Sequence, residues 1–183
     1  MTWAQAWILT LERKFPEALQ VLQKFRGETL KTPTTAPCPK AFLEGSICRL
    51  QGDEAKARTE LEHARVISEQ LLREAPDDPN RHGQHGLILA TLGQKKEAIN
   101  EGKRAVQLLP ESQDAYDGPQ VTAVLAQIHA WTGEFDEAFR LLDHLLAVPN
   151  GLAVPVLKLD PAWDPLREDP RFQALIDKYA ANR

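Results

Sequence analysis

The sequence predicts an all-α fold, a solenoid built from antiparallel helix pairs, and three observations support it. A turn-like hexapeptide recurs about every 40 residues, and self-similarity at such a period is typical of repeat proteins. Around each copy, apolar or small residues stand three or four positions apart, which is the spacing of one helix face. Hydrophobic residues make up 43% of the 183 residues, enough to bury a core without disulfides or metals.

The recurring hexapeptide predicts the turn between two helices. Its copies are residues 52–57, 93–98 and 133–138, with a weaker copy at residues 13–18, and each copy ends in alanine. Three copies begin with glycine, which readily adopts the left-handed conformation that ends a helix. Small residues at the contacts let the two helices approach to ~8–10 Å. The predicted turn and contact positions are Gly45, Gly52, Ala57, Gly86, Gly93, Ala98, Ala105, Ala126, Gly133 and Ala138.

Stretches of turn-forming residues separate the copies and set the expected boundaries. Residues 1–149 are expected to hold the repeats, and residues 150–183 a C-terminal extension. The linker at residues 31–37 is expected to be a turn-rich connection. The second helix of the second unit is expected to be long, from about Asp53 to Ala75. The four units are expected at about residues 1–27, 38–76, 79–112 and 119–149.

The positions of these small residues resemble the tetratricopeptide repeat (TPR) family. The third unit matches best, with Gly86, Gly93, Ala98 and Ala105 in place and Pro110 closing it. The chain departs from the pattern at aromatic positions: His82 stands where tryptophan is usual, and Gly102 where an aromatic residue is usual. Its period is also longer than the usual ~34 residues. The resemblance implies a right-handed solenoid whose first helices line a concave, protein-binding groove.

The last residues predict a helix that covers the end of the solenoid. Asp169 is a helix cap, Pro170 suits a first helical turn, and the amphipathic face that follows runs from Phe172 to Tyr179 through Leu175 and Ile176. Residues 159–172 resemble the ending of bacterial multidomain signalling proteins. In those proteins such repeats follow a serine/threonine kinase, a cyclase or a winged-helix regulator. The resemblance implies the sensor or scaffold end of such a protein.

Composition and charge argue against several classes of partner. The formal net charge is -4 and the sequence pI about 5.8, unlike the basic stripe of a nucleic-acid binder. No apolar run approaches the ~18 residues of a membrane span.

The first four residues lack the pattern of a signal peptide, and Cys38 and Cys48 are too far apart along a helix for a disulfide. A reducing, cytoplasmic location is therefore expected. Cys38, between two prolines, is either a somewhat activated thiol or an incidental exposed one.

Motifs for catalysis are missing from the sequence, so the chain is not expected to be an enzyme or to hold a cofactor. It contains no phosphate-cradling glycine loop, kinase signature or nucleophile elbow. His82 and His85 share a helical face at a spacing that suits a metal, but no clear third ligand accompanies them. His129 falls on the packing face and is expected to be a packed histidine. No metal site is therefore expected.

The expected groove carries apolar and polar candidates on the first helix of each pair. As alternatives, Trp3 and Trp7 would pack against a missing half-repeat and Trp131 would belong to the core. A largely apolar groove would suit an extended or helical segment. Chaperone-binding members of the family grip a carboxylate with a clamp that includes lysines. No lysine stands at the corresponding positions here, which are Pro39, Phe42, Leu43, Ser46, Asn80, Gly83, Gln84 and Leu87. The resemblance therefore argues against that clamp. The candidates are Trp7, Phe42, Arg49, Gln84, Leu87, Gln127 and Trp131.

Two functions from different classes follow from this pattern. The leading hypothesis is a protein-interaction scaffold that binds a peptide or protein segment in the groove. The alternative is a regulatory module of a bacterial signalling protein that self-associates, forming a homodimer through an exposed solenoid end. A metal-dependent enzyme is a third reading that depends only on His82 and His85. Neither nucleic acid nor a membrane is an expected partner.

Overall fold

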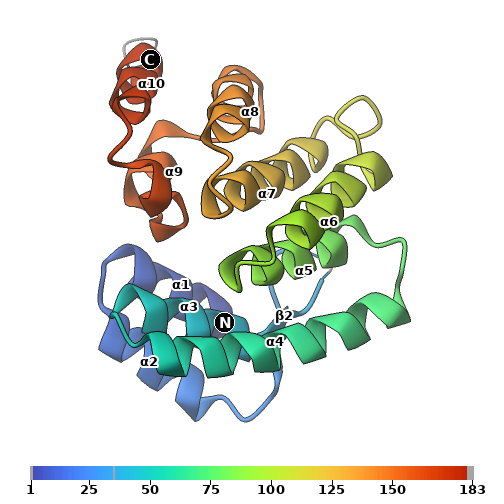
Figure 1. Cartoon of the computed structure of the whole chain (residues 1–183), viewed down its shortest axis with the longest axis vertical. Coiled ribbons are helices and arrows are strands. Elements are labelled where there is room, and N and C mark those ends of the chain that lie inside the picture. The colour runs from blue at the N-terminus through green and yellow to red at the C-terminus, as the bar shows by residue number, and fades with distance from the viewer. Residues whose placement is uncertain (1, 35, 181–183) are drawn as a thin grey trace.

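A computed structural model describes residues 2–34 and 36–180, and its helices follow one another around a closed curve (Figure 1). Ten α-helices and one 3-10 helix hold nearly all the regular structure of these residues, which confirms the all-α class. The helices are α1 (Thr2–Leu11), α2 (Phe15–Lys24), α3 (Lys40–Leu50), α4 (Glu54–Glu74), α5 (Pro79–Thr91), α6 (Lys95–Leu108), α7 (Gly118–Trp131), α8 (Phe135–Ala147), α9 (Val154–Leu159), η1 (Pro161–Leu166) and α10 (Pro170–Ala180).

Consecutive helices pack as four pairs. The helices within each pair, α1–α2, α3–α4, α5–α6 and α7–α8, contact each other along their length, and each pair contacts the next through α2–α3, α4–α5 and α6–α7. Seven of the eight helices lie within the unit boundaries expected from the sequence, and α7 begins one residue earlier, at Gly118. The repeat period therefore translates into a chain of helix pairs in which each pair touches its sequence neighbours.

The turn inside each pair ends the first helix in the same way. The turn glycine has φ of 81° in the second pair, 79° in the third and 77° in the fourth. In the second pair the N–H of Asp53 donates to the carbonyl of Cys48 at 3.0 Å, the hydrogen bond that defines a Schellman motif. Lys14 donates likewise to Leu9 at 2.8 Å in the first pair. There Arg13 occupies the glycine position, with φ of 59°.

Small residues make the close contacts within each pair, as the sequence predicts. A Cβ at Gly86 would lie 3.0 Å from the carbonyl oxygen of Ala98 within the pair and 2.8 Å from Cδ1 of Ile128 in the next pair, so a larger residue would require these groups to shift. A Cβ at Gly45 would lie 2.8 Å from Cγ of Leu61. The alanine that ends each hexapeptide is fully buried in all four pairs, at Ala18, Ala57, Ala98 and Ala138.

The long helix α4 has the expected limits, but the linker before α3 differs from expectation. The Asp53 carboxylate caps α4 by accepting from the N–H of Lys56 at 3.1 Å, and the helix ends at Glu74. The stretch predicted as a turn-rich linker is flanked by β1 (Thr29–Leu30) and β2 (Cys38–Pro39), which pair antiparallel. Leu30 is buried with Ala6, Ala18 and Leu22 of the first pair. The burial of Leu30 therefore holds this segment against the first pair. The turn-forming residues around Leu30 gave no indication of that burial.

Both readings of Cys38 are wrong. The side chain is buried in the same cluster as Leu30, and burial raises the pKa of its thiol to about 12. A thiol so protected from ionisation is neither activated nor exposed. Cys48 is buried as well, and desolvation raises the pKa of its thiol. Both cysteines are free, as predicted.

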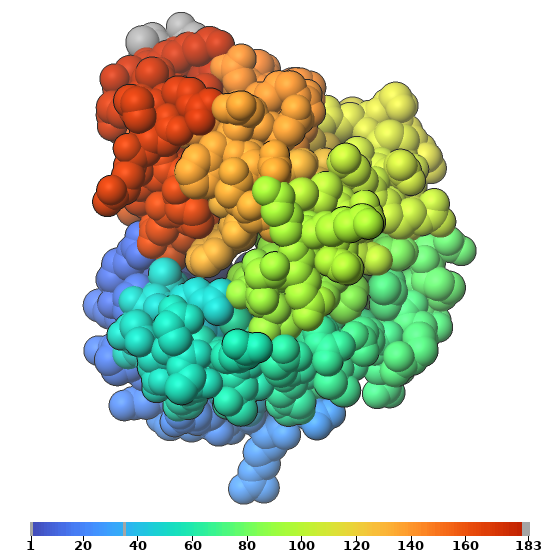
Figure 2. Space-filling model, viewed as in Figure 1, coloured from blue at the N-terminus to red at the C-terminus, as the bar shows by residue number. Residues whose placement is uncertain are grey.

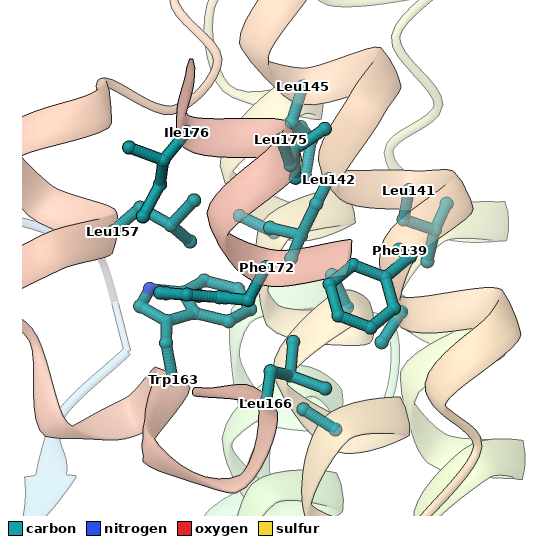
Figure 3. Packing of buried hydrophobic residues seen from close by; sticks show 14 of the residues in the cluster. Phe139, Leu141, Leu142, Leu145, Leu157, Trp163, Leu166, Phe172, Leu175 and Ile176 are labelled. Carbon is teal, nitrogen blue, oxygen red and sulfur yellow. The ribbon is translucent and has the colours of Figure 1, made fainter. Parts of the chain in front are cut away.

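The C-terminal extension covers the fourth pair. As predicted, α10 begins after Asp169, whose carboxylate accepts from the N–H of Arg171 at 2.9 Å. Its buried face packs into a cluster with α8 in which Trp163 lies beside Phe172 (Figure 3). The Tyr179 hydroxyl donates to the carbonyl of Asp143 at 2.8 Å. The sequence did not predict α9 and η1, yet Trp163 and Leu166 of η1 are fully buried there.

Candidate functional site

The seven predicted groove residues all lie half-buried on the first helices of the pairs. We call them the candidate face: Trp7, Phe42, Arg49, Gln84, Leu87, Gln127 and Trp131. On α7 the residues that are not buried form a single stripe, Gln120, Val124, Gln127 and Trp131, at spacings of four, three and four. The other sides of α7 are covered by neighbouring helices. The stripe therefore marks the one side of this helix that solvent or a ligand reaches.

Three apolar members of the candidate face also belong to the packing between pairs. Phe42 packs against two buried clusters, one centred on the first pair and one that contains Ile88. Leu87 and Trp131 pack against the cluster of Leu89, Ala90, Ala98 and Ile128. The two roles that the sequence left open, groove and core, are thus shared by single side chains. Charged substitutions of Phe42 or Leu87 would disturb packing together with any binding.

The polar members of the candidate face are engaged in contacts between helices. The Arg49 guanidinium donates to the backbone carbonyl of Thr91 in α5 and pairs with Glu54 at 3.4 Å. The Gln84 side chain hydrogen-bonds the thiol of Cys38 in β2. Because these contacts join the second pair to the third, Arg49 and Gln84 position helices as well as line the candidate face.

The tryptophans at the two ends of the candidate face both contact the C-terminal extension. Trp3 and Trp7 stack, with ring centroids 5.6 Å apart and planes 11° from parallel. The Trp7 side chain also lies close enough to Asp160 to favour the charged form of its carboxylate. From the other end, the Trp131 indole N–H donates to the carbonyl of Ala162 at 2.9 Å. The segment at residues 160–164 therefore spans from the first pair to the fourth, an arrangement that the sequence analysis missed.

A cleft of about 370 Å³ lies outside the candidate face, between α2 and the second pair. Charged side chains of both signs line it, including Arg26, Lys40, Glu44 and Glu60. Burial raises the pKa of Glu44, while the ammonium of Lys40, 3.6 Å away, opposes that shift. With mixed charges and no residue of the candidate face in its lining, the cleft adds no member to that face.

The predicted histidine pair is held by hydrogen bonds. His82 Nδ1 lies 2.6 Å from a Glu101 carboxylate oxygen, and its Nε2 lies 2.8 Å from the carbonyl of Pro76. His85 Nδ1 lies 2.8 Å from the Ser68 hydroxyl, and burial lowers the pKa of His85. Across residues 2–34 and 36–180, no group of three side chains is arranged to ligate a metal. Both ring nitrogens of His82 are thus already engaged in hydrogen bonds.

Comparison of the chain with protein-family models, with curated proteins and with solved structures gives no match in any of the three. Among the helices in the described part of the chain, none combines the length and the apolar character that crossing a membrane requires. Function is therefore inferred from the geometry of the helix pairs and of the candidate face.

Proposed function

We propose that this chain is a right-handed solenoid of antiparallel, TPR-type helix pairs and that it binds a protein or peptide segment along the candidate face. The support for the family assignment is the repeated Schellman turn, the buried alanine that follows it and the glycines at the helix crossings. The resemblance of the tail to bacterial signalling proteins suggests that the module serves as a scaffold there.

The stripe on α7 carries the proposal. A first helix whose only accessible side bears Val124, Gln127 and Trp131 offers apolar anchors with a polar group between them. That combination suits an extended or helical segment, which gains affinity from apolar contacts and register from hydrogen bonds. Gln84 and Leu87 place a similar polar and apolar pair on α5, so the surface continues from one helix pair to the next.

A capture experiment with matched variants tests this function. Gln127→Arg adds a long charged side chain to the stripe without removing a core residue, and Asn100→Arg makes the same kind of change on the exposed side of α6. We expect a protein retained by the wild type to be lost by Gln127→Arg and kept by Asn100→Arg. Identical capture by all three folded proteins would contradict binding at the candidate face.

A second candidate function, self-association in a regulatory module, has one specific observation in its favour. Ile8 of α1 is 51% exposed, whereas Ile47, Ile88 and Ile128 at the equivalent position are 0–2% exposed, packed against the pair before them. An apolar residue of this kind suits contact with a second helix surface. Light scattering of the wild type and Ile8→Lys decides the matter: a monomer at high concentration removes this candidate, and a dimer that Ile8→Lys dissociates supports it.

A further inference from the structure

An ion pair joins the first helix pair to the C-terminal extension. Arg13, in the turn between α1 and α2, donates from Nη1 and Nη2 to the two carboxylate oxygens of Asp164 in η1, at 2.7 and 2.8 Å. This fork-to-fork geometry is the most directional form of a salt bridge. The partners are 151 positions apart in sequence. In Figure 1 the two ends of the helical curve meet at this place, and Figure 2 shows their surfaces in contact.

The backbone of Arg13 is strained in a way that its side chain explains. At the same turn position the other three pairs have glycine, which adopts positive φ without a steric cost. Arg13 adopts φ of 59° despite its Cβ. A non-glycine residue in this region persists when other interactions favour it, and such residues concentrate at functional contacts. Within residues 2–34 and 36–180, the side-chain hydrogen bonds of Arg13 both go to Asp164, and this contact accounts for arginine at a glycine position.

The contact joins the net positive first helix pair to the two carboxylates of residues 160–164. Residues 1–40 carry six Lys or Arg against three Glu, while the rest of the chain carries sixteen against 23 Asp or Glu. Burial acts to raise the pKa of Asp164, but hydrogen bonds from Arg13 and Arg167 outweigh it and hold that pKa below its ordinary value. Burial raises the pKa of Asp160, against influences that include the Trp7 side chain. The two carboxylates of residues 160–164 thus face groups of the first pair that favour their charged forms.

One side of this contact is much more firmly held than the other. In η1, Trp163 and Leu166 are fully buried against the fourth pair, so η1 is anchored there. Its ion pair with the first pair is partly exposed, since the Arg13 and Asp164 side chains are 42% and 28% exposed. Exposed ion pairs contribute little free energy, and apolar burial contributes much. Separating η1 from the first pair therefore costs less free energy than separating it from the fourth pair.

We propose that the Arg13–Asp164 ion pair forms a clasp that closes the curve of helices and sets how widely the candidate face opens. Release of the clasp moves the first pair away from η1 while η1 stays on the fourth pair. The clasp depends on contacts within the chain, so it stands or falls separately from the proposed binding function. Trp7 and Trp131, both in the candidate face, lie close to the same segment, which places the clasp at that face.

The experiment measures the distance between the two sides of the clasp in the full chain. Gln20→Cys on α2 and Ala174→Cys on α10 place spin labels at exposed positions, and the native cysteines are buried. Asp164→Asn and Arg13→Gly each remove the ion pair, and the second also places glycine at a turn that favours it. Arg167→Gln removes the ion pair of Arg167 with Asp164, at 2.6 Å, and its hydrogen bond to the Asp160 carbonyl, at 3.2 Å, while the Arg13–Asp164 pair remains.

We expect Asp164→Asn and Arg13→Gly to shift the label distances to longer values and to broaden them. We expect 1 M salt to do the same to the wild type, since the screening length falls to ~3 Å. Arg167→Gln should keep the wild-type distribution. Wild-type distances in both clasp variants would overturn the proposal, as would an equal shift in Arg167→Gln. Circular dichroism checks folding, and Arg13→Gly decides alone if Asp164→Asn does not fold.

Discussion

Helices α1 and α7 occupy equivalent places in their pairs but differ in how much of them is buried. In α7, ten of fourteen residues are buried, whereas in α1 only Ala6 is buried. Helix α7 is contacted by α5, α6, α8 and η1, while the main neighbour of α1 is α2. The repeat pattern therefore selects which residues face a neighbour, and the presence of the neighbour decides whether they are buried.

The isoleucines five residues before each turn show this difference at a single position. Ile128 fills the space that Gly86 and Gly102 leave, with its Cδ1 2.8 and 2.7 Å from where a Cβ would stand on each. Ile8 has the same local sequence position but is half exposed. One amino acid at one repeat position thus has a packing role at one end of the molecule and a surface role at the other.

Truncating these isoleucines tests the difference and has the largest expected effect. Ile128→Ala opens a cavity between the third and fourth pairs, and we expect it to lower the free energy of unfolding by about 2–5 kcal/mol. Ile8→Ala removes a half-exposed side chain and should cost less than about 1 kcal/mol. Urea unfolding followed by circular dichroism measures both values. Equal losses would show that Ile8 is packed in solution by a surface that the structure does not include.

The turn residue is arginine in the first pair and glycine in the other three. Substitutions at this position are expected to change the free energy of unfolding less than the isoleucine truncations do. A Cβ at Gly93 would meet no heavy atom within 4 Å, so the cost of Gly93→Arg comes from the backbone at φ of 79°. We expect a loss of about 1–2 kcal/mol. Arg13→Gly removes the same strain but also the exposed ion pair, which contributes about 0–1 kcal/mol. Its stability should therefore match or exceed that of the wild type, and the gain should grow with salt.

Urea unfolding at low and high salt provides the comparison of these two turn variants. A stability loss for Arg13→Gly as large as that for Gly93→Arg would mean that the Asp164 contact outweighs the backbone strain at Arg13. In that case the closed curve of helices would be a main source of stability for the first pair.

The sequence predicts the features that depend on residues close in the chain. The limits of α4, the buried alanines and the cap of α10 all follow from helix periodicity, capping side chains and turn glycines. Helices α9 and η1 were missed because each is only six residues long and begins near a proline. The burial of Leu30 and Cys38 was missed because their neighbours are Thr and Pro, which are typical of exposed linkers.

The candidate face was predictable as a set of positions, but its contacts were not. Repeat alignment places Gln84, Leu87, Gln127 and Trp131 on first helices, and the structure leaves them half-buried there. The contact of Trp7 and Arg13 with residues 160–164 depends on how the small rotations between successive pairs add up over the whole chain. One signal of it was present in the sequence, since Arg13 replaces the glycine of the other three turns.

The buried histidine of α7 gives the smallest of these tests. His129 stands where the first and third pairs have Leu9 and Leu89, and its Nδ1 lacks a hydrogen-bond partner among the described residues. Burial lowers the pKa of His129 below its ordinary value of 6.5, with Lys103 and Arg140 acting in the same direction and Glu137 and Glu134 against it. The unfolded chain then binds a proton more readily than the folded one. The contribution of His129 to the free energy of unfolding is therefore fully present above pH 6.5. It falls as the pH falls, by no more than about 1.4 kcal/mol per pH unit.

His129→Leu introduces the leucine that the first and third pairs have at this position, and it removes the titratable ring. Unfolding measured from pH 7.5 to 5 should show a shallower loss of stability than in the wild type, with part of the slope remaining because burial also lowers the pKa of His85. At pH 7 the variant should gain about 1 kcal/mol, since it removes a buried nitrogen without a partner. His63→Gln, at an exposed histidine, serves as the matched control variant. An unchanged slope in His129→Leu would mean that the ring binds a proton as readily in the folded state as in the unfolded state, which requires water or a carboxylate to reach it between α7 and α8.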